Sequence, residues 1–321
     1  MKRTLGKNGP EITTVGFGAW AAGGPWKVGW GPQSDEDSIA AIRKSLDLGM
    51  NWIDTAAIYG LGHSETVTGE AIQGFKREDI LIFTKCGRVP DESGTPHSDL
   101  TPASIRNELT ASLKRLGTDY IDLYQFHWPD NETGTPIEDS WAVMASLQDE
   151  GLVRWIGVSN FDVDLLTRCK VVRHVDSLQP PFSLVRQDVA GEILPWCEQN
   201  GTGVIVYSPM QSGLLSGTFD IGRIAADDWR HRSPYFQEPQ LSINLDFVEQ
   251  LRGIAERHGA TVGQLAVAWT LSNSAVSGAI VGARSPSQVE QNRLAMDIVL
   301  TEQDINEIGK LVANRAIALE G

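Results

Sequence analysis

The stretch Asn51-Trp-Ile-Asp-Thr-Ala-Ala-Ile-Tyr-Gly60 guides the interpretation of the whole chain. It begins as a short apolar run of strand type. That run ends at the acid Asp54, where the buried part of the strand is expected to end. Five residues later Tyr59 precedes a glycine, which places the phenol in a turn rather than in a helix. We therefore expect an acid and a phenol near the end of one strand.

Two further polar side chains follow apolar runs in the same way. Lys85 follows the run at 80–84, and His127 follows the run at 121–126. An acid, a phenol, an amine and an imidazole at the ends of strands indicate one site that several strands assemble.

Strand-like and helix-like segments alternate along the rest of the sequence. A hairpin comes first, with strands at 2–5 and 11–14 around the turn signal Asn8-Gly9. A strand at 15–20 and a helix at 34–49 follow. Each further unit is a predicted strand followed by one or two helices. The strands are at 51–54, 80–84, 120–126, 153–158, 175–178, 203–207 and 278–281. The helices that follow them are, in the same order, at 64–74, at 101–117, at 137–150, from 162, at 188–200, at 244–258 and 262–272, and from 285, and a C-terminal helix begins after the cap Thr301.

Eight such units predict an α/β fold, a single (β/α)8 TIM barrel that forms one domain at 1–321. The N-terminal β-hairpin and the extra C-terminal helix are additions to it. A doubly wound sheet is the alternative for the same alternation, but no Gly-x-Gly-x-x-Gly motif follows the first strand. Because the site of a barrel lies at the C-terminal ends of its strands, Asp54, Lys85 and His127 are expected to meet there.

Composition limits the classes of partner. The net charge of the 321 residues is 27 − 41 = −14, which argues against nucleic acid and anionic membranes as partners. The three cysteines and the six histidines show no metal-like spacing, so no metal is expected. The start lacks the apolar core of a signal peptide, and no run reaches membrane-spanning length. We expect a cytoplasmic protein with reduced thiols and a small-molecule partner, and the sequence leaves assembly into a homo-oligomer open.

Several segments resemble the signature sequences of the aldo-keto reductases. They are Trp52-Ile-Asp-Thr-Ala-Ala-Ile-Tyr-Gly60, Phe83-Thr-Lys-Cys86, His127-Trp-Pro-Asp130, Ile156-Gly-Val-Ser-Asn160 and Gly282-Ala-Arg284. Their order extends the resemblance from the hairpin to the helix after Ser285. The resemblance implies a (β/α)8 barrel and the NAD(P)H-dependent reduction of aldehydes and ketones.

The resemblance also assigns a catalytic tetrad of Asp54, Tyr59, Lys85 and His127. Reduction of a carbonyl requires a proton on oxygen, and a free tyrosine, with a pKa of about 10, gives up its proton reluctantly. The Lys85 ammonium is expected to lower that pKa, while Asp54 keeps the lysine protonated and oriented toward the phenol. His127 would orient the carbonyl by a hydrogen bond. Tyr59 would then be the general acid in reduction and the base in the reverse reaction.

The resemblance implies a coenzyme site in the later loops. The residues assigned to the nicotinamide end are Ser159, Asn160, Gln179 and Tyr207, whose ring would stack on the nicotinamide. The loop over the pyrophosphate is 208–213, with Ser208, Met210 and Gly213. The residues assigned to the adenosine end are Gly282, Arg284, Gln288, Gln291 and Asn292. Arg284 would face a 2′-phosphate, so NADPH is preferred and NADH is not excluded. The alternative for Arg284 is a solvated loop residue, and 285–288 is also a helix cap.

Trp20 and Trp128 are the predicted walls of a pocket for a small carbonyl or alcohol substrate. The family often continues Gln-x-x-Tyr, whereas this chain has Gln179-Pro-Pro-Phe-Ser183, which alters that wall. Two other functions stay open. One is a cofactor-binding regulatory subunit with little turnover, and the other is a lyase or aldolase that uses Lys85 as a Schiff-base amine. The Asp54–Lys85 pair could also be only a buried ion pair.

Overall fold

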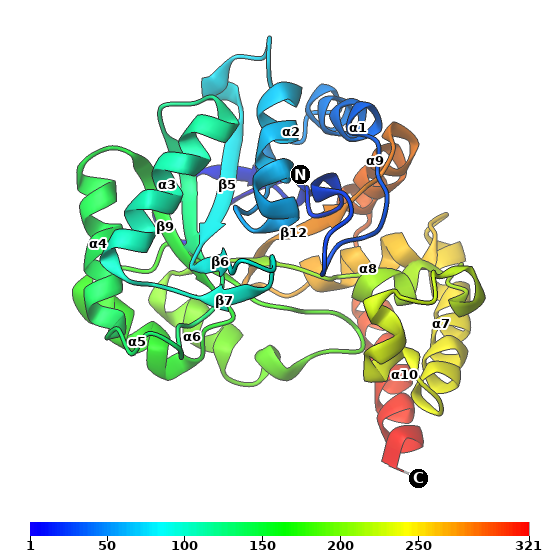
Figure 1. Ribbon diagram of the computed structural model, residues 1–321. Helices are drawn as coiled ribbons and strands as arrows, with labels where there is room; N and C mark the ends of the chain where they lie inside the picture. Colours follow the sequence, from blue (N-terminus) through cyan, green and yellow to red (C-terminus); the bar gives the residue numbers. More distant parts are fainter. Residues whose placement is uncertain (321) are drawn as a thin grey trace.

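Eight parallel strands close into a barrel in the computed structural model of the protein, which describes residues 1–320 (Figure 1). The strands are β3 Val15–Gly18, β4 Trp52–Asp54, β5 Leu81–Cys86, β8 Ile121–Phe126, β9 Val153–Ser159, β10 Ser177–Gln179, β11 Gly203–Val206 and β12 Val276–Gly282. They neighbour one another in chain order, and β12 pairs with β3 to close the ring. The predicted (β/α)8 barrel is therefore confirmed.

Helices surround the barrel, and several begin after a residue whose side chain accepts a backbone N–H group of the first turn. They are α1 Asp35–Asp47, α2 His63–Ala71, α3 Pro102–Leu116, α4 Ile137–Asp149, α5 Val163–Val172, α6 Ile193–Asn200, α7 Gln240–Arg257, α8 Val262–Leu271, α9 Pro286–Arg293 and α10 Glu302–Glu320. Thr101 accepts the backbone N–H of Ser104 at the start of α3, and Gly117 ends that helix at a φ of 64°. These are ordinary N-cap and left-handed C-terminal signals, and they explain why this helix was predictable.

The predicted hairpin covers the N-terminal end of the barrel. Its strands are β1 Lys2–Thr4 and β2 Glu11–Thr13. The Trp52 indole donates a hydrogen bond of 2.7 Å to the carbonyl of Thr13, and the Trp155 indole donates one of 2.9 Å to the carbonyl of Asn8. This end of the barrel is therefore closed, and the C-terminal ends of the strands remain for a site.

A second apolar cluster lies beside the barrel, where α7 and α10 pack together (Figure 1, yellow and red). It includes Phe247 and Leu251 of α7, Leu265 of α8 and Ile308 of α10. The same cluster takes in Leu214 from the segment after β11. These helices thus support the loop that was predicted to cover the pyrophosphate.

The structure corrects several details of the prediction. Lys85 lies inside β5 rather than after it, and β10 begins two residues later than predicted. Helix α6 begins at Ile193 rather than at 188, and α7 begins at Gln240 rather than at 244. A second hairpin, β6 Arg88–Pro90 with β7 Pro96–Ser98, follows β5 and was not predicted.

Gly16 in β3 shows how closely the barrel interior is packed. A Cβ atom at this position would lie 2.1 Å from the Trp52 ring, whose side chain is fully buried. We predict that Gly16→Ala lowers the free energy of unfolding by about 1–3 kcal/mol, because the ring has no room to move away. The control is Gly253→Ala in α7, where a Cβ meets nothing within 4 Å. Urea denaturation should show a lower midpoint for the first variant only, and equal midpoints would contradict this account of the packing.

Candidate active site

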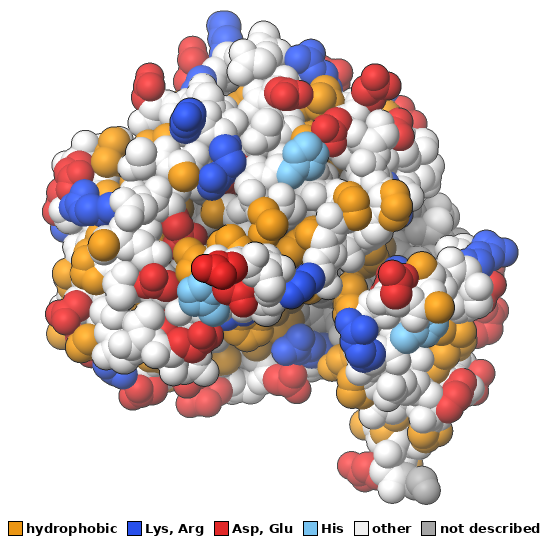
Figure 2. Space-filling model, in the orientation of Figure 1, with side chains coloured by type: hydrophobic (Ala, Val, Ile, Leu, Met, Phe, Trp, Pro, Cys, Tyr) orange, Lys and Arg blue, Asp and Glu red, His pale blue; other side chains and the backbone are white. Residues whose placement is uncertain are grey.

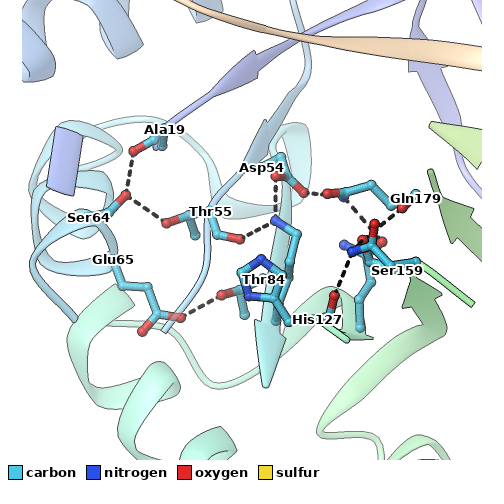
Figure 3. A network of polar contacts seen from close by, with 12 residues as sticks. Ala19, Asp54, Thr55, Ser64, Glu65, Thr84, His127, Ser159 and Gln179 are labelled. Atoms are coloured by element: carbon cyan, nitrogen blue, oxygen red, sulfur yellow. Dashed lines mark hydrogen bonds and ion pairs between the residues drawn. The ribbon is translucent and has the colours of Figure 1, made fainter. Parts of the chain in front are cut away.

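A buried ion pair lies at the C-terminal end of β4 and β5. The Lys85 ammonium is 2.5 Å from Asp54 Oδ1 and donates a second hydrogen bond of 2.8 Å to the carbonyl of Thr55 (Figure 3). The other carboxylate oxygen of Asp54 accepts a hydrogen bond of 2.8 Å from Gln179 Nε2. Lys85 is 1 % exposed and Asp54 is 3 % exposed. Two charges at this depth are stable only when each is paired and hydrogen-bonded, as here.

A second, partly buried ion pair lies behind the first, on the other face of β5. Successive residues of a strand point to opposite faces, so Thr84 faces outward where Lys85 faces inward. Thr84 donates a hydrogen bond of 2.6 Å to the buried carboxylate of Glu65 (Figure 3). Arg115 of α3, which is partly exposed, lies 2.6 Å from the same carboxylate. Ser64, the neighbour of Glu65, donates to the carbonyl of Ala19. The start of α2 is therefore tied to β5, to α3 and to the end of β3.

Tyr59 stands on the turn that leads into α2. Gly60 and Leu61 have φ values of 59° and 56°, and a Cβ at Gly60 would lie 2.1 Å from the carbonyl oxygen of Gly23, so only glycine fits there. The turn presents the Tyr59 ring to the other members of the tetrad. Its centroid is 5.2 Å from Lys85 Nζ and 5.5 Å from the centroid of the His127 ring.

The protonation of these groups follows from burial. The pKa of Tyr59 is raised well above 10, first by burial and then by the negative charge of Asp54. Burial and Asp54 together set the direction of this shift, so the contribution expected from the Lys85 ammonium stays a prediction. Burial also lowers the pKa of Lys85, against the opposing charge of Asp54. The pKa of His127 is lowered well below 6.5 by burial and by the nearby Lys85 and Arg88 charges. At neutral pH the phenol is protonated and the imidazole is neutral.

One cavity of about 720 Å³ opens at this end of the barrel, and nearly all the predicted site residues line it. They are Trp20, Asp54, Tyr59, His127, Trp128, Ser159, Asn160, Gln179, Tyr207, Ser208, Met210, Gly213, Gly282, Arg284, Gln288, Gln291 and Asn292. Lys85 is the exception, since it lies behind Asp54 and reaches no cavity surface. A buried lysine whose ammonium is bonded to Asp54 and Thr55 gives no support to a Schiff-base mechanism.

Polar side chains at the centre of the cavity hold one another in place. Ser159 donates to the carbonyl of Gln179 at 2.7 Å, and Asn160 donates to the carbonyl of His127 at 3.0 Å. Tyr207 donates a hydrogen bond of 2.8 Å to Asn160 Oδ1. These amides and hydroxyls form a fixed polar group beside the tetrad, as binding of a carboxamide would require.

The segment after β11 turns tightly beside the cavity. Ser208, Gln211, Ser212 and Gly213 all have φ between 45° and 94°, and the N–H groups of Gln211 and Gly213 close turns onto the carbonyls of Ser208 and Met210. A Cβ at Gly213 would meet only Phe219, at 4.0 Å, so space is open beside that backbone. With Arg284 farther along the same cavity, the residues present fit a dinucleotide with a pyrophosphate and an adenosine end.

Two further loops line the cavity. Arg88 and Pro96 come from the β6–β7 hairpin, and Trp26, Val28 and Trp30 come from the loop before α1. The turn of the hairpin is held by Asp91, whose carboxylate accepts backbone N–H groups two and four residues ahead. Asp91-Glu-Ser-Gly94 is a recognisable turn sequence, so this hairpin had a signal that was not used.

In residues 1–320, no group of three or more His, Cys, Asp or Glu side chains is arranged to hold a metal ion. Within the same range, every helix is too short or too polar to cross a membrane.

Sequence and structure comparisons agree on one family. The sequence model described as "Aldo/keto reductase family" matches residues 14–313. The chain is 36 % identical to the aldo-keto reductase YhdN of Bacillus subtilis (97 % of this chain, 93 % of the relative) and 34 % identical to an NADH-specific methylglyoxal reductase of Escherichia coli (99 % of each). It is 32 % identical to a probable voltage-gated potassium channel subunit beta of Arabidopsis thaliana (98 % and 97 %). The solved structure of the glycerol dehydrogenase AKR11B4 from Gluconobacter oxydans is similar with a TM-score of 0.88 and 34 % identity, over 98 % of this chain and 95 % of that one.

The buried pair makes a direct prediction about stability. Asp54→Asn leaves the Lys85 ammonium without its charge partner, so the free energy of unfolding should fall by about 3–5 kcal/mol. Lys85→Met should also be destabilising, while the double variant should lose less than the sum of the two. Urea denaturation of the four proteins gives the coupling energy. Additive effects would show that the two charges do not depend on each other.

Proposed function

The chain belongs to the aldo/keto reductase family, and on that basis we propose that it reversibly reduces the carbonyl of an aldehyde or ketone with NAD(P)H. The observation that carries the proposal is one cavity, which joins Asp54, Tyr59 and His127 to the polar group and to the tightly turned segment at 208–213. The proton donor and the coenzyme site would then share one space.

When bound, the reduced coenzyme supplies the hydride that the carbonyl carbon accepts. Tyr59 holds the proton for the carbonyl oxygen, and its raised pKa keeps that proton in place until the oxygen becomes basic. His127, neutral at physiological pH, would donate a hydrogen bond to the same oxygen. The Lys85 ammonium, oriented by Asp54, would stand 5.2 Å from the Tyr59 ring and offset part of the negative charge of a phenolate as it forms. In the reverse direction Tyr59 would act as the base.

The relatives suggest the kind of substrate. One acts on methylglyoxal and another is a glycerol dehydrogenase, so we propose a small carbonyl compound or the corresponding alcohol. Trp20 and Trp128 would wall the pocket, and hydrophobic side chains do gather across the middle of the face that Figure 2 presents. For the coenzyme we propose NADPH, because Arg284 lines the adenosine end, and the NADH-specific relative keeps NADH as the alternative.

A regulatory role is the second candidate, since one relative is a probable potassium channel subunit. It differs from the first in one measurable respect. A regulatory subunit would bind NADPH tightly and turn over a broad panel of aldehydes and ketones negligibly, whereas the proposed enzyme would consume coenzyme with at least one of them.

The mechanism predicts that Tyr59→Phe lowers turnover of a reactive aldehyde by roughly a hundred- to ten-thousand-fold, because the proton donor is lost. Binding of NADPH, measured by quenching of tryptophan fluorescence, should be unchanged. Tyr120→Phe is the matched control, because that ring packs between Arg77 and Arg154. Full activity of the Tyr59 variant would end the proposed mechanism.

The raised pKa of Tyr59 also predicts how the rate depends on pH. A phenol with a pKa well above 10 stays protonated, so its titration should not lower kcat for reduction between about pH 6 and about pH 9. The oxidation of an alcohol needs the phenolate, so its kcat should rise with pH over the same range. Steady-state rates in both directions test this, and a reduction rate that falls near neutral pH with loss of the Tyr59 proton would contradict it.

A further inference from the structure

The loop at 24–34, which we call the strap, runs over the cavity and is tied at three places (Figure 1, the blue loop that leads into α1). Lys27 donates hydrogen bonds to Ser93 and Thr95 in the β6–β7 hairpin, and the Trp20 indole donates one of 3.0 Å to the carbonyl of Val28. The third tie joins Gln33 to Arg284, 251 residues away. The strap therefore reaches from the substrate pocket to the adenosine end of the cavity.

The third tie is a reciprocal clasp. Arg284 Nε donates a hydrogen bond of 2.7 Å to Gln33 Oε1, and Gln33 Nε2 donates one of 3.1 Å back to the carbonyl of Arg284. A second guanidinium nitrogen, Nη2, donates to the carbonyl of Pro32. One edge of the guanidinium is thereby fixed on the strap, which leaves Nη1 and the second Nη2 hydrogen free to donate.

The charge of Arg284 is not neutralised by the clasp. Both acceptors are neutral oxygens, and no carboxylate within residues 1–320 lies within 4 Å of this guanidinium. The chain carries 41 acidic residues against 27 basic ones, and many of its other arginines have an acidic partner. An oriented arginine with an uncompensated charge on a cavity wall suits an anion, and guanidinium matches phosphate with two parallel hydrogen bonds.

We propose that Gln33 is a specificity residue that selects a coenzyme with a 2′-phosphate over one with a free 2′-hydroxyl. Gln33 holds the Arg284 side chain in one orientation without neutralising it, so the free edge meets the phosphate with little loss of side-chain entropy. The inference rests on the proposed coenzyme site and deepens it. It assigns to the strap a role in choosing between NADPH and NADH.

Two variants of Gln33 separate orientation from charge. Gln33→Ala removes the clasp, so Arg284 becomes mobile and the affinity for NADPH should fall about three- to ten-fold, a modest effect because the site is exposed to solvent. Gln33→Glu keeps the size of the side chain and the acceptor for Arg284 Nε, loses the hydrogen bond to the carbonyl of Arg284, and places a carboxylate against the guanidinium, which compensates its charge. The affinity for NADPH should then fall further, by at least about ten-fold. The affinity of either variant for NADH should stay within about two-fold of wild type.

The experiment is isothermal titration of NADPH and of NADH into the wild-type protein, Gln33→Ala, Gln33→Glu and Arg284→Ala. Gln303→Ala, an exposed glutamine on α10, is the control, and equal melting temperatures show that all variants are folded. Losses confined to NADPH in the stated order support the inference. Unchanged or tighter NADPH binding by Gln33→Ala, or an equal loss for both coenzymes, overturns it.

The outcomes of this titration also distinguish a failure of this inference from a failure of the proposed function. If the wild-type protein binds both coenzymes and the Gln33 variants behave like it, the coenzyme site stands and only the role of Gln33 fails. If Arg284→Ala binds NADPH as tightly as wild type, the adenosine end is wrongly assigned and the inference falls with it. If the wild-type protein binds neither coenzyme, the proposed function fails as well.

Discussion

The ion pair between Lys85 and Asp54 is the constraint on which the rest of the site depends. A lysine ammonium and a carboxylate with almost no exposed surface are each costly to bury, and the cost is offset only while every hydrogen bond is made. Those hydrogen bonds join β4, β5 and β10. Gln179 of β10 donates to the second carboxylate oxygen of Asp54, and Lys85 donates to the carbonyl of Thr55, which directly follows β4. The register of three strands is thus tied to the charge state of two side chains. The pair keeps a positive charge near the Tyr59 ring, and burial keeps the phenol protonated.

The cavity has a rigid side and a looped side. Tyr59, His127 and the ion pair stand on or directly beside barrel strands, and the Glu65 carboxylate joins the start of α2 to β5 and α3. The facing wall consists of the strap and the segment after β11, and the latter rests on the apolar cluster of α7, α8 and α10. Groups that must meet within hydrogen-bonding distance are therefore on the rigid side. The walls that must admit a coenzyme are on loops, which can move without disturbing the ion pair.

The sequence predicted the barrel, and it predicted Asp54, Lys85 and His127 near the ends of strands, because both follow from local patterns. Apolar runs, caps such as Thr101 and polar residues at strand ends are all visible within a few positions. What it did not predict depends on long-range contacts. Gln179 and Asp54 are 125 residues apart, and no local pattern shows that the amide completes the carboxylate. The upward shift of the Tyr59 pKa was not predicted for the same reason, since it depends on how far the ring is buried and on its distance from Asp54. The β6–β7 hairpin was also not predicted, but its turn sequence at 91–94 is a local signal that could have predicted it.

The distribution of charge explains how an acidic chain could hold an anionic coenzyme. Charges spread over the surface are screened within about 8 Å at physiological salt, so the charged groups on the cavity wall determine whether an anion is attracted there. Two arginines line this wall, and they are held differently. Arg88, beside His127, donates to Ser98 and to the carbonyl of Pro96, with Glu132 at 3.9 Å, so part of its charge is compensated. Arg284 has neutral acceptors only. The uncompensated positive charge therefore lies at the Arg284 end of the cavity, away from the phenol, whose pKa is raised by burial and by Asp54.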